Sequence, residues 1–324
     1  SRIACFRIGV DRSAMEAVAR EGRTTAGWRD RLEDRRLLAT VLIAPAVTFI
    51  AVLVGGPLLL AIYLSFTNAI AGSLTGDFVG IDNFKLQWEN PIFRDALKNT
   101  FFFTLVSQVI VLVLAKVLAN FLVRDFRGKW FLRFLIILPW AAPISLGILG
   151  WKWIFDSLYS SVNWMGQALH LLGERENPQW TGNPDLTMAA VITAHTWRLL
   201  PFATIIIIAG LSSIPREIED AAAVDGATGW RRMFYVTIPL VLPIMTIALL
   251  FGIVFTATDM VVVYLLANNG GPFNSTHMIT TWSFTTGILS GSLGPGAAIS
   301  LFLFPILLVV TVLMLWFARR TEVA

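Results

Sequence analysis

Charge is the first thing that this sequence has little of. Only 14% of its 324 residues are Asp, Glu, Lys or Arg, and 56% are hydrophobic, whereas charged residues make up about 25% of a typical soluble domain. The mean hydropathy is +0.70. This composition excludes an ordinary soluble protein and indicates a chain that crosses a membrane several times. Core helices of a large soluble protein are the disfavoured alternative, because soluble helices average roughly 11–12 residues.

Cysteine and histidine are scarce as well. Cys5 is the single cysteine and has no internal disulfide partner, and the 3 histidines are too widely spaced to form a metal-ligand cluster. The sequence contains no G-x-x-x-x-G-K-[ST] phosphate loop, no G-x-S-x-G elbow and no H-E-x-x-H helix. We therefore expect no catalytic residues, no metal and no cofactor in this chain, and no ATP held by a phosphate loop.

Six stretches are long and apolar enough to cross a bilayer, which takes about 20 residues of helix. They are residues 37–66, 99–123, 134–155, 186–211, 236–266 and 297–318. Prolines lie within several of them, and membrane helices tolerate proline because neighbouring groups satisfy the freed carbonyls. These are Pro139, Pro143, Pro201, Pro243 and Pro305. The predicted fold class is an all-α membrane protein with six kinked transmembrane helices.

Lysine and arginine orient these spans, because loops on the cytoplasmic side carry more of them. The arm 1–36, "RDFRGKWFLR" (124–133), the loop 213–235 and the tail 319–324 are basic or mixed, and all fall on one side of a six-span chain. The opposite loops, 67–97, 156–185 and 267–296, carry few basic residues. We therefore predict a cytoplasmic N-terminal arm (1–36), a transmembrane domain (37–318) and a cytoplasmic tail (319–324), so that both termini are cytoplasmic.

The most polar interruption of the second half reads "EIEDAAAVDGATGWRRMFYVTIPLVLP", residues 217–243. Ser213 is suited to cap a helix there, with Pro215 in its first turn. Gly226 is placed to end that helix in a left-handed turn, and Pro239 starts the next span. The segment thus predicts a short helix on the membrane surface. On its own, without the pattern described next, a connector that only solvates its charges is the favoured interpretation.

The residue pattern within this loop resembles the cytoplasmic signature of permease subunits in bacterial ATP-driven importers, Glu-Ala-Ala, three residues, Gly, nine residues, Ile-x-Leu-Pro. The matching residues are Asp220, Ala221, Ala222, Gly226, Val236, Ile238 and Pro239. Asp replaces Glu, Val replaces Ile and Ile replaces Leu. The segments "FVGIDNF", "ALKNTFFFT", "ILPWAAPISLGILGWKWIF" and "NNGGPFNST" resemble the sugar-importer branch, in particular the larger permease subunit of maltose-transporter-like systems.

The resemblance implies the partners and the location. The short helix would be a coupling helix, docked through Asp220, Ala221, Ala222, Gly226 and Pro239 in a groove of an ATPase subunit. Two copies of that ATPase would bind ATP and Mg, a second permease would complete the path, and an extracytoplasmic solute-binding protein would deliver a carbohydrate. The chain would lie in the bacterial inner membrane, in contact with the lipid bilayer and with no nucleic acid.

Ionisable residues within spans are functional candidates, because each costs about 2.5–3.5 kcal/mol to insert. Arg198 and Asp259 are deep, of opposite sign and on consecutive spans, and Trp197 and Thr256 beside them add an aromatic face and a hydroxyl. These four residues are our candidates for the substrate path. A purely structural ion pair between Arg198 and Asp259 is the open alternative, and His195 is expected to be a hydrogen-bonded packing residue.

Two other lysines have simpler interpretations. Lys152 lies between Trp151 and Trp153 near the outer end of its span, and Lys116 lies about two turns from a span end, so that both can extend toward the membrane surface. The outer loops "NPQWTGNPD" and "NNGGPFNST" are either docking sites for the binding protein or plain connectors.

Two alternatives to the functional hypothesis stay open at this point. A secondary transporter or channel without an ATPase is the main rival, although we find no internal repeat of the kind that many such proteins contain. Within the family, the solute could also be a phosphorylated polyol such as glycerol phosphate, for which Arg198 would suit the anion.

The charge bias makes a direct prediction about topology. With Cys5 removed, single cysteines at Ser73, Thr181 and Ser290 should react with a membrane-impermeant maleimide added to intact cells, because their loops are predicted to be external. A cysteine at Thr228 should react only after the membrane is permeabilised. The reverse labelling pattern would invert the orientation.

Overall fold

The computed structural model describes residues 35–73, 75–156, 158–174 and 176–322. It divides into two units, residues 1–60 and 61–324. Nearly all of the predicted arm 1–36 lies outside the described residues. The described chain is almost entirely helical and has no strand, which confirms the predicted all-α membrane fold.

The first unit contains helix α3 (Arg35–Ile50), the π-helical turn η1 (Ala51–Gly55) and the start of α4 (Gly56–Ser65). Together they form a candidate span of 28 residues, Leu38–Ser65, with mean hydropathy 2.4. The glycines at 55 and 56 do not end the helix here. They widen it locally into one π-turn, so that the predicted first span is continuous.

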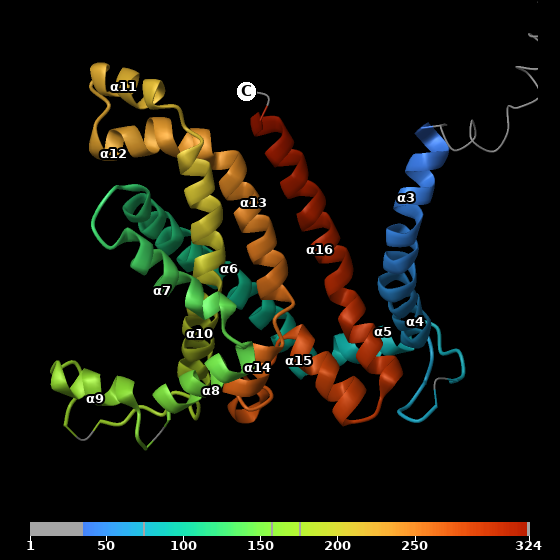
Figure 1. Ribbon diagram of the computed structural model, residues 1–324. Helices are drawn as coiled ribbons and strands as arrows, with labels where there is room; N and C mark the ends of the chain where they lie inside the picture. The colour runs from blue at the N-terminus through green and yellow to red at the C-terminus, as the bar shows by residue number, and fades with distance from the viewer. Residues whose placement is uncertain (1–34, 74, 157, 175, 323–324) are drawn as a thin grey trace, which may run out of the picture. The chain divides into compact units, whose positions relative to one another are not determined.

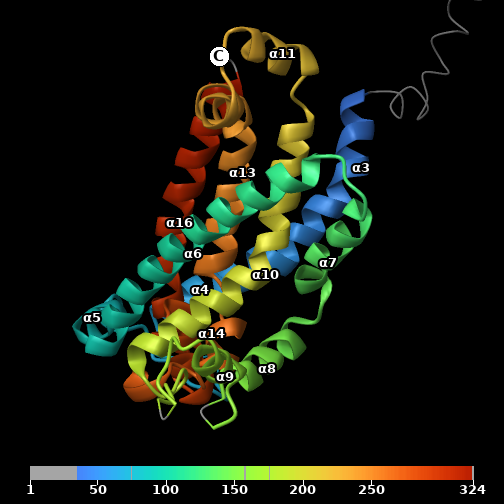
Figure 2. The same cartoon turned by 90° about the vertical axis from the view of Figure 1, so that its left-hand side faces the viewer.

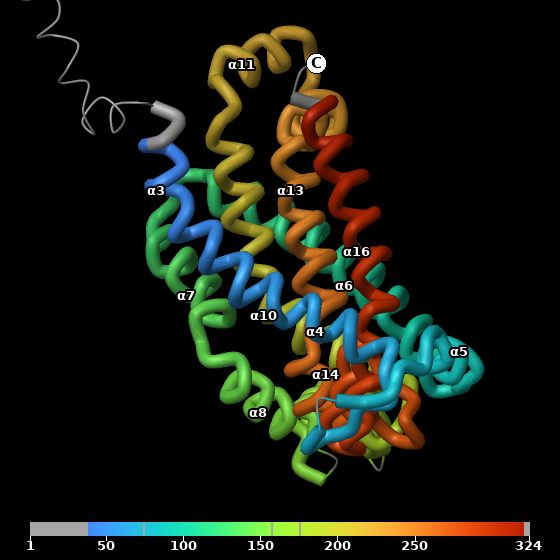
Figure 3. Tube along the Cα trace, turned by 90° about the vertical axis from the view of Figure 1, so that its right-hand side faces the viewer, coloured from blue at the N-terminus to red at the C-terminus, as the bar shows by residue number. Residues whose placement is uncertain are grey.

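Four long helices form the centre of the second unit. They are α6 (Pro91–Val123), α10 (Pro184–Ser212), α13 (Ile238–Ala257) and α16 (Leu293–Glu322). Helix α13 packs between α10 and α16, while α6 packs across both α10 and α13 (Figures 2 and 3). The seam between α6 and α10 alternates small and large buried side chains, among them Ala115, Ala119, Ala203 and Ile207. Small residues let membrane helices approach closely.

Asparagine and proline start two of these helices. The Asn90 side chain accepts from the Ile92 N–H at 2.9 Å, and Asn183 accepts from the Asp185 N–H at 3.0 Å. A proline follows each asparagine at the first helical position, where its missing N–H removes no intrahelical bond. The Asn-Pro pair therefore fixes where each span begins.

Two predicted spans are broken. The stretch 134–155 forms α7 (Lys129–Ala141) and α8 (Ile144–Ile154), which are bent by 97° at the break. Pro143 lies at that break, and proline disfavours helical backbone in the residue before it. The stretch 236–266 ends as a helix at Ala257, and Val261–Leu266 form a separate helix, α14. The membrane candidates thus number five, or six if α7 and α8 together make one span.

Short elements gather toward the two ends of the second unit (Figure 1). At one end lie α5 (Asp82–Glu89), α9 (Ser161–Ala168), α14, η3 (Pro272–Asn274), α15 (Ile279–Phe284) and η4 (Thr285–Leu289). At the other end lie α11 (Arg216–Val224), α12 (Gly229–Arg232) and η2 (Met233–Thr237). We call these the α9 end and the α11 end.

Glycine allows α16 to touch η4 directly. A Cβ added to Gly287 would lie 3.3 Å from the Gly296 Cα, and one added to Gly296 would lie 2.7 Å from the Gly287 nitrogen. The Ser283 hydroxyl donates to the Gly296 carbonyl across the same contact, at 2.8 Å. Any side chain at position 296 therefore has to push the two backbones apart.

We predict that Gly296→Ala destabilises the fold by about 1–3 kcal/mol, the usual range for overpacking. The matched control is Gly150→Ala in α8, where an added Cβ meets nothing within 4 Å. The measurement is the melting temperature of each purified variant in detergent. A Gly296→Ala variant that melts with the control would contradict the close contact.

Candidate functional site

Helix α11 stands at its own end of the structure with nearly every side chain exposed (Figure 1). Asp220 and Ala221 are exposed, whereas Ala222 is buried, with 8% of its surface accessible. Two glutamates, Glu217 and Glu219, lie in its first turn, where carboxylates interact favourably with the helix dipole. The helix therefore presents small and acidic residues to the outside.

A left-handed turn ends α11 at Gly226, as the sequence predicts. Gly226 has φ +74°, its N–H donates to the Ala223 carbonyl at 3.1 Å, and the Ala227 N–H donates to the Ala222 carbonyl at 2.8 Å. This pair of bonds is the Schellman motif. A side chain at position 226 is disfavoured by the backbone conformation even though the space around it is empty.

The turn at residues 225–228 connects α11 to α12, and from α12 the helical structure is continuous into the span α13. The short α12 runs into the π-turn η2, and η2 runs directly into α13. Pro239 occupies the first turn of α13, and Arg232 lies 4.0 Å from Glu219 across the α11–α12 turn.

The predicted cap at Ser213 is wrong. Its hydroxyl donates back to the Gly210 carbonyl of α10 at 2.8 Å, and Pro215 is the residue that precedes α11.

Asp259 is the centre of a second candidate site, in the break between α13 and α14. Its Oδ2 accepts from His195 Nδ1 at 2.8 Å and from Arg198 Nη1 at 3.1 Å. Its Oδ1 accepts from the Val262 N–H at 3.2 Å, which starts helix α14. The carboxylate side chain is 3% exposed and that of His195 is 1% exposed. One residue thus joins α10 to the break between α13 and α14.

The network continues through Thr256 to helix α6. Thr256 Oγ1 lies 2.9 Å from His195 Nε2, and Gln108 Nε2 donates to it at 2.6 Å. The same hydroxyl lies 2.7 Å from the Gly252 carbonyl. Because the Asp259 carboxylate can only accept, His195 carries its proton on Nδ1 whether Thr256 donates to Gly252 or to His195.

This network is expected to hold three spans in register. Breaking a buried ion pair by removing one partner typically destabilises a protein by about 3–5 kcal/mol, because the remaining charge is left without compensation. Gly252 is necessary for the arrangement, since a Cβ there would overlap the Gln108 side-chain amide. His195 is a hydrogen-bonded packing residue, as expected, and its T-shaped contact with Phe103 at 4.9 Å fixes the ring further.

Arg198 is the one member of the charged group that reaches the surface, with 29% of its side chain exposed. Its guanidinium lies 5.9 Å from the ring centroid of Trp140 on α7. Trp140 stacks on Phe202 at 5.0 Å and contacts Phe255 at 5.9 Å, and Phe251 lies 6.1 Å from Phe255. We call Trp140, Phe202, Phe251 and Phe255 the aromatic wall.

The aromatic wall is open to its surroundings. Trp140 is 38% exposed, Phe255 39% and Phe251 46%. It joins α7, α10 and α13, which are far apart in the sequence, and that is why sequence reasoning missed it. Arg198 therefore borders a surface of exposed rings as well as the buried carboxylate.

The four residues predicted for the substrate path do not share one surface. Arg198 and Asp259 pair as expected, but Thr256 is 1% exposed and Asp259 is 7% exposed. Trp197 faces α8, where its ring lies 5.8 Å from Trp151. Of the four, Arg198 alone both joins the network and reaches the aromatic wall.

Lys116 differs from expectation. It is 7% exposed and, among the described residues, its ammonium group has no hydrogen-bond partner, so that a side chain that extends toward the membrane surface does not explain it. Lys152 Nζ donates to Asn268 Oδ1 at 2.6 Å, so that it connects α8 to the loop after α14.

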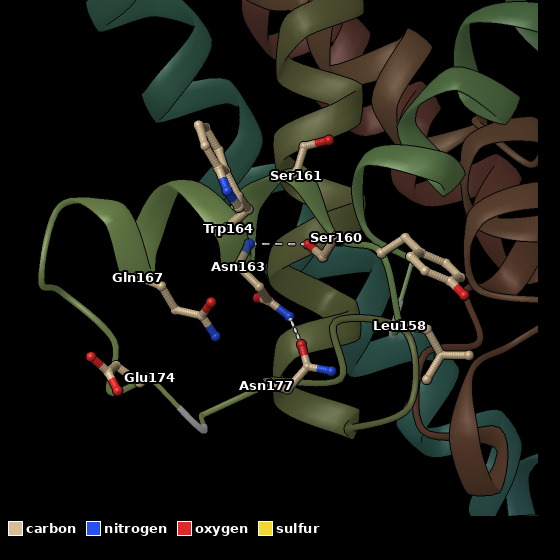
Figure 4. Close-up of a pocket in the computed structure, with 9 residues that line it drawn as sticks. Leu158, Ser160, Ser161, Asn163, Trp164, Gln167, Glu174 and Asn177 are labelled. Atoms are coloured by element: carbon tan, nitrogen blue, oxygen red, sulfur yellow. Dashed lines mark hydrogen bonds between the residues drawn. The ribbon is translucent and has the colours of Figure 1, made fainter.

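A polar cavity of about 570 Å³ lies at the α9 end (Figure 4). Asn163 forms its floor between Ser160 and Asn177, and the Asn163 carbonyl oxygen also accepts from Trp180 Nε1 at 2.7 Å. The side-chain amide of Asn163 therefore makes its hydrogen bonds to residues of its own loop.

The pKa of Asp156 lies below its ordinary value, because its carboxylate accepts hydrogen bonds from the backbone N–H groups of Tyr159 and, with a smaller effect, Leu158.

Comparison with known proteins gives a family and relatives. A family model described as "Binding-protein-dependent transport system inner membrane component" matches residues 113–323. A sulfoquinovosyl glycerol transport system permease of Agrobacterium fabrum is 31% identical, over 91% of this chain and 94% of the relative. A trehalose/maltose transport system permease of Thermococcus litoralis is 28% identical, over 87% of this chain and 94% of the relative.

Solved structures agree on the fold. A bacterial ABC transporter that imports the acidic polysaccharide alginate matches with a TM-score of 0.74 and 19% identity, over 90% of this chain and 98% of that chain. A second structure of the alginate transporter, in complex with a periplasmic protein bound to an alginate pentasaccharide, matches with a TM-score of 0.73 and 20% identity, over 90% and 97%. The family match, the similarity to the Agrobacterium permease and the helical architecture agree, and the chain belongs to the inner-membrane components of binding-protein-dependent transport systems.

Proposed function

We propose that this chain is one of two permease subunits that together form the membrane path for a carbohydrate in an ATP-driven importer. An extracytoplasmic binding protein delivers the solute, and two ATPase subunits at the α11 end, which bind ATP and Mg, supply the energy by hydrolysing ATP. The chain itself carries no catalytic role. In this orientation the α11 end and both termini are cytoplasmic.

The exposed helix α11 is the observation that carries the proposal. A surface helix of charged residues and alanines, with a single buried side chain at Ala222, gains little from folding against its own chain. Its ordered Schellman turn, and the continuous helical structure from α12 to α13 that follows this turn, suit a rigid element that binds another protein. Movement of α11 would then pass through η2 and Pro239 into the span that carries the polar network.

The aromatic wall is our candidate for the surface that faces the solute. Sugar rings carry apolar C–H faces and polar edges, so that exposed aromatic rings beside hydrogen-bond donors suit them. Arg198 has free donors at the border of the wall. We place Arg198 and Trp140 on the path. On the buried side, Asp259 accepts a hydrogen bond from Arg198, and Thr256 supports this carboxylate through His195.

The names of relatives indicate the class of solute. They describe permeases for sulfoquinovosyl glycerol, trehalose and maltose, diacetylchitobiose, and sn-glycerol-3-phosphate. All of these are carbohydrates or polyol derivatives, and two of them, sulfoquinovosyl glycerol and sn-glycerol-3-phosphate, are anionic. A sugar or sugar-like solute is therefore the substrate class that we propose, and the guanidinium of Arg198 would also accommodate an anionic member.

The coupling role is tested on the complex purified from bacterial membranes through a tag on this chain. We expect a second permease and an ATPase to copurify, and Gly226→Val to reduce sugar uptake and binding-protein-stimulated ATPase activity at least about tenfold, which corresponds to about 1.4 kcal/mol. A β-branched residue cannot adopt φ +74° without strain, so that α11 loses its turn.

The matched control is Thr228→Val, two residues away, where φ is −113° and valine fits the backbone. Asp220→Glu restores the signature residue and should be mild. Purification of the chain without an ATPase would favour a secondary transporter, and normal transport by Gly226→Val at normal expression would remove the coupling role from this turn.

The network and the aromatic wall make separable predictions. Asp259→Leu should reduce the yield of folded complex, because Arg198, His195 and the Val262 N–H all lose their acceptor. Arg198→Leu should leave most of the complex assembled, because His195 still pairs with the carboxylate, yet slow uptake at least about tenfold if Arg198 lines the path.

A double-mutant cycle with both leucine substitutions decides between the two roles. The measurements are the amount of assembled complex and the rate of sugar uptake. If the double variant transports at the wild-type rate, Arg198 and Asp259 form a structural pair and neither contacts the solute.

A further inference from the structure

The loop between α14 and α15, residues 267–278, is dominated by left-handed backbone. Asn268, Asn269 and Asn274 have φ of 49°, 63° and 61°, a conformation that asparagine tolerates. Phe273 lies among them with φ of 56°. A bulky residue in this region is a genuine outlier, because its Cβ crowds the following carbonyl oxygen.

Hydrogen bonds fix the first half of this loop to distant elements. Asn268 Oδ1 accepts from Lys152 of α8 at 2.6 Å, and Asn269 Oδ1 accepts from the Thr285 hydroxyl of η4 at 2.9 Å. The Gly271 N–H donates to the Ala267 carbonyl at 2.6 Å. The first half of the loop is therefore fixed by α8, by η4 and by a backbone hydrogen bond of its own.

The second half is fixed as firmly. Asn99 Nδ2 of α6 donates to the carbonyls of Ser275 at 2.7 Å and His277 at 3.1 Å. His277 is 1% exposed, and burial lowers its pKa to about 4, so that the ring is neutral at physiological pH. Gly270 packs against this ring so closely that a Cβ would overlap it. The loop is a rigid base on both sides of Phe273.

The Phe273 side chain has almost no packing contact with the rest of this rigid loop, because 93% of its surface is exposed. No intramolecular packing therefore compensates the unfavourable backbone conformation of the residue. Asn, Gly, Ser and Thr surround it in the sequence, and such polar neighbours favour an aqueous boundary over the lipid interior. Backbone strain of this kind persists at functional sites, where the surrounding structure imposes it.

We infer that Phe273 is the anchor by which the solute-binding protein docks on this subunit, with its ring in an apolar pocket on that protein's surface. The loop lies at the α9 end, opposite α11 (Figure 1), and the family to which the chain belongs depends on a binding protein. An aromatic side chain on a backbone that is already fixed loses less entropy on association than one on a flexible loop, and such anchors dominate interface energetics. The inference rests on the proposed function.

The test measures ATPase activity of the whole complex in nanodiscs as purified, sugar-loaded binding protein of the same importer is added. Phe273→Ala should raise the binding-protein concentration for half-maximal stimulation at least tenfold, with basal ATPase activity unchanged. Phe273→Trp should stay near the wild type. The matched control is Tyr159→Ala, which removes an aromatic ring that is 86% exposed at the same end from a residue outside the left-handed region.

Two outcomes would overturn the inference. One is an unchanged titration curve for Phe273→Ala; if this variant also melts at a lower temperature in nanodiscs, the ring lies in lipid. The other is an equal loss of stimulation for Tyr159→Ala. Phe273→Gly tests the strain separately. It should lose stimulation as Phe273→Ala does but melt at a higher temperature than that variant, because glycine accepts φ of 56°; equal melting temperatures would remove the strain argument.

The same experiment separates this inference from the proposed function. A wild-type complex that does not respond to the binding protein contradicts the proposed function itself. A wild-type complex that responds, together with a Phe273→Ala variant that responds equally well, contradicts the anchor alone.

Discussion

A buried carboxylate inside a membrane has to be compensated, and Asp259 shows how the second unit meets that requirement. Each of its oxygens accepts hydrogen bonds, from His195 and Arg198 of α10 and from the first turn of α14. The charge can exist at this depth because these groups converge on it. The break after α13, the register of α10 and the exposed position of Arg198 all follow from that convergence.

The two ends of the second unit differ in how they present residues. At the α11 end, an exposed helix ends in an ordered turn at Gly226, and beyond that turn α12 runs through η2 into α13. At the α9 end, the loop around Phe273 is fixed by bonds from α6, α8 and η4. Both are rigid elements whose outer faces have little contact with their own chain, as is expected of surfaces that partners cover. The helices between them, above all α13, connect the two ends.

Much of this could be predicted from residues that act locally. The apolar stretches predicted the spans, because length and composition suffice to cross a bilayer, and the signature from Asp220 to Pro239 located α11 and its glycine turn. Local reasoning failed where the outcome depended on another helix. The span 236–266 is apolar apart from Asp259 and a few hydroxyl residues, so that its composition does not reveal that the helix stops after Ala257 and starts again at Val261. Ser213 was predicted to cap α11, but its hydroxyl donates to the Gly210 carbonyl one turn earlier in α10.

The sequence by itself determined the membrane class, the family and the position of α11, because hydropathy, charge bias and motif spacing are properties of short stretches. Tertiary structure alone decided which polar residues meet and which face outward. It buried Thr256, turned Trp197 toward α8, brought Gln108 into the network and assembled the aromatic wall from α7, α10 and α13. The physical reason is that a helix has several faces. The sequence gives the residues on each face, but only packing against neighbouring helices decides which face is covered and which is open.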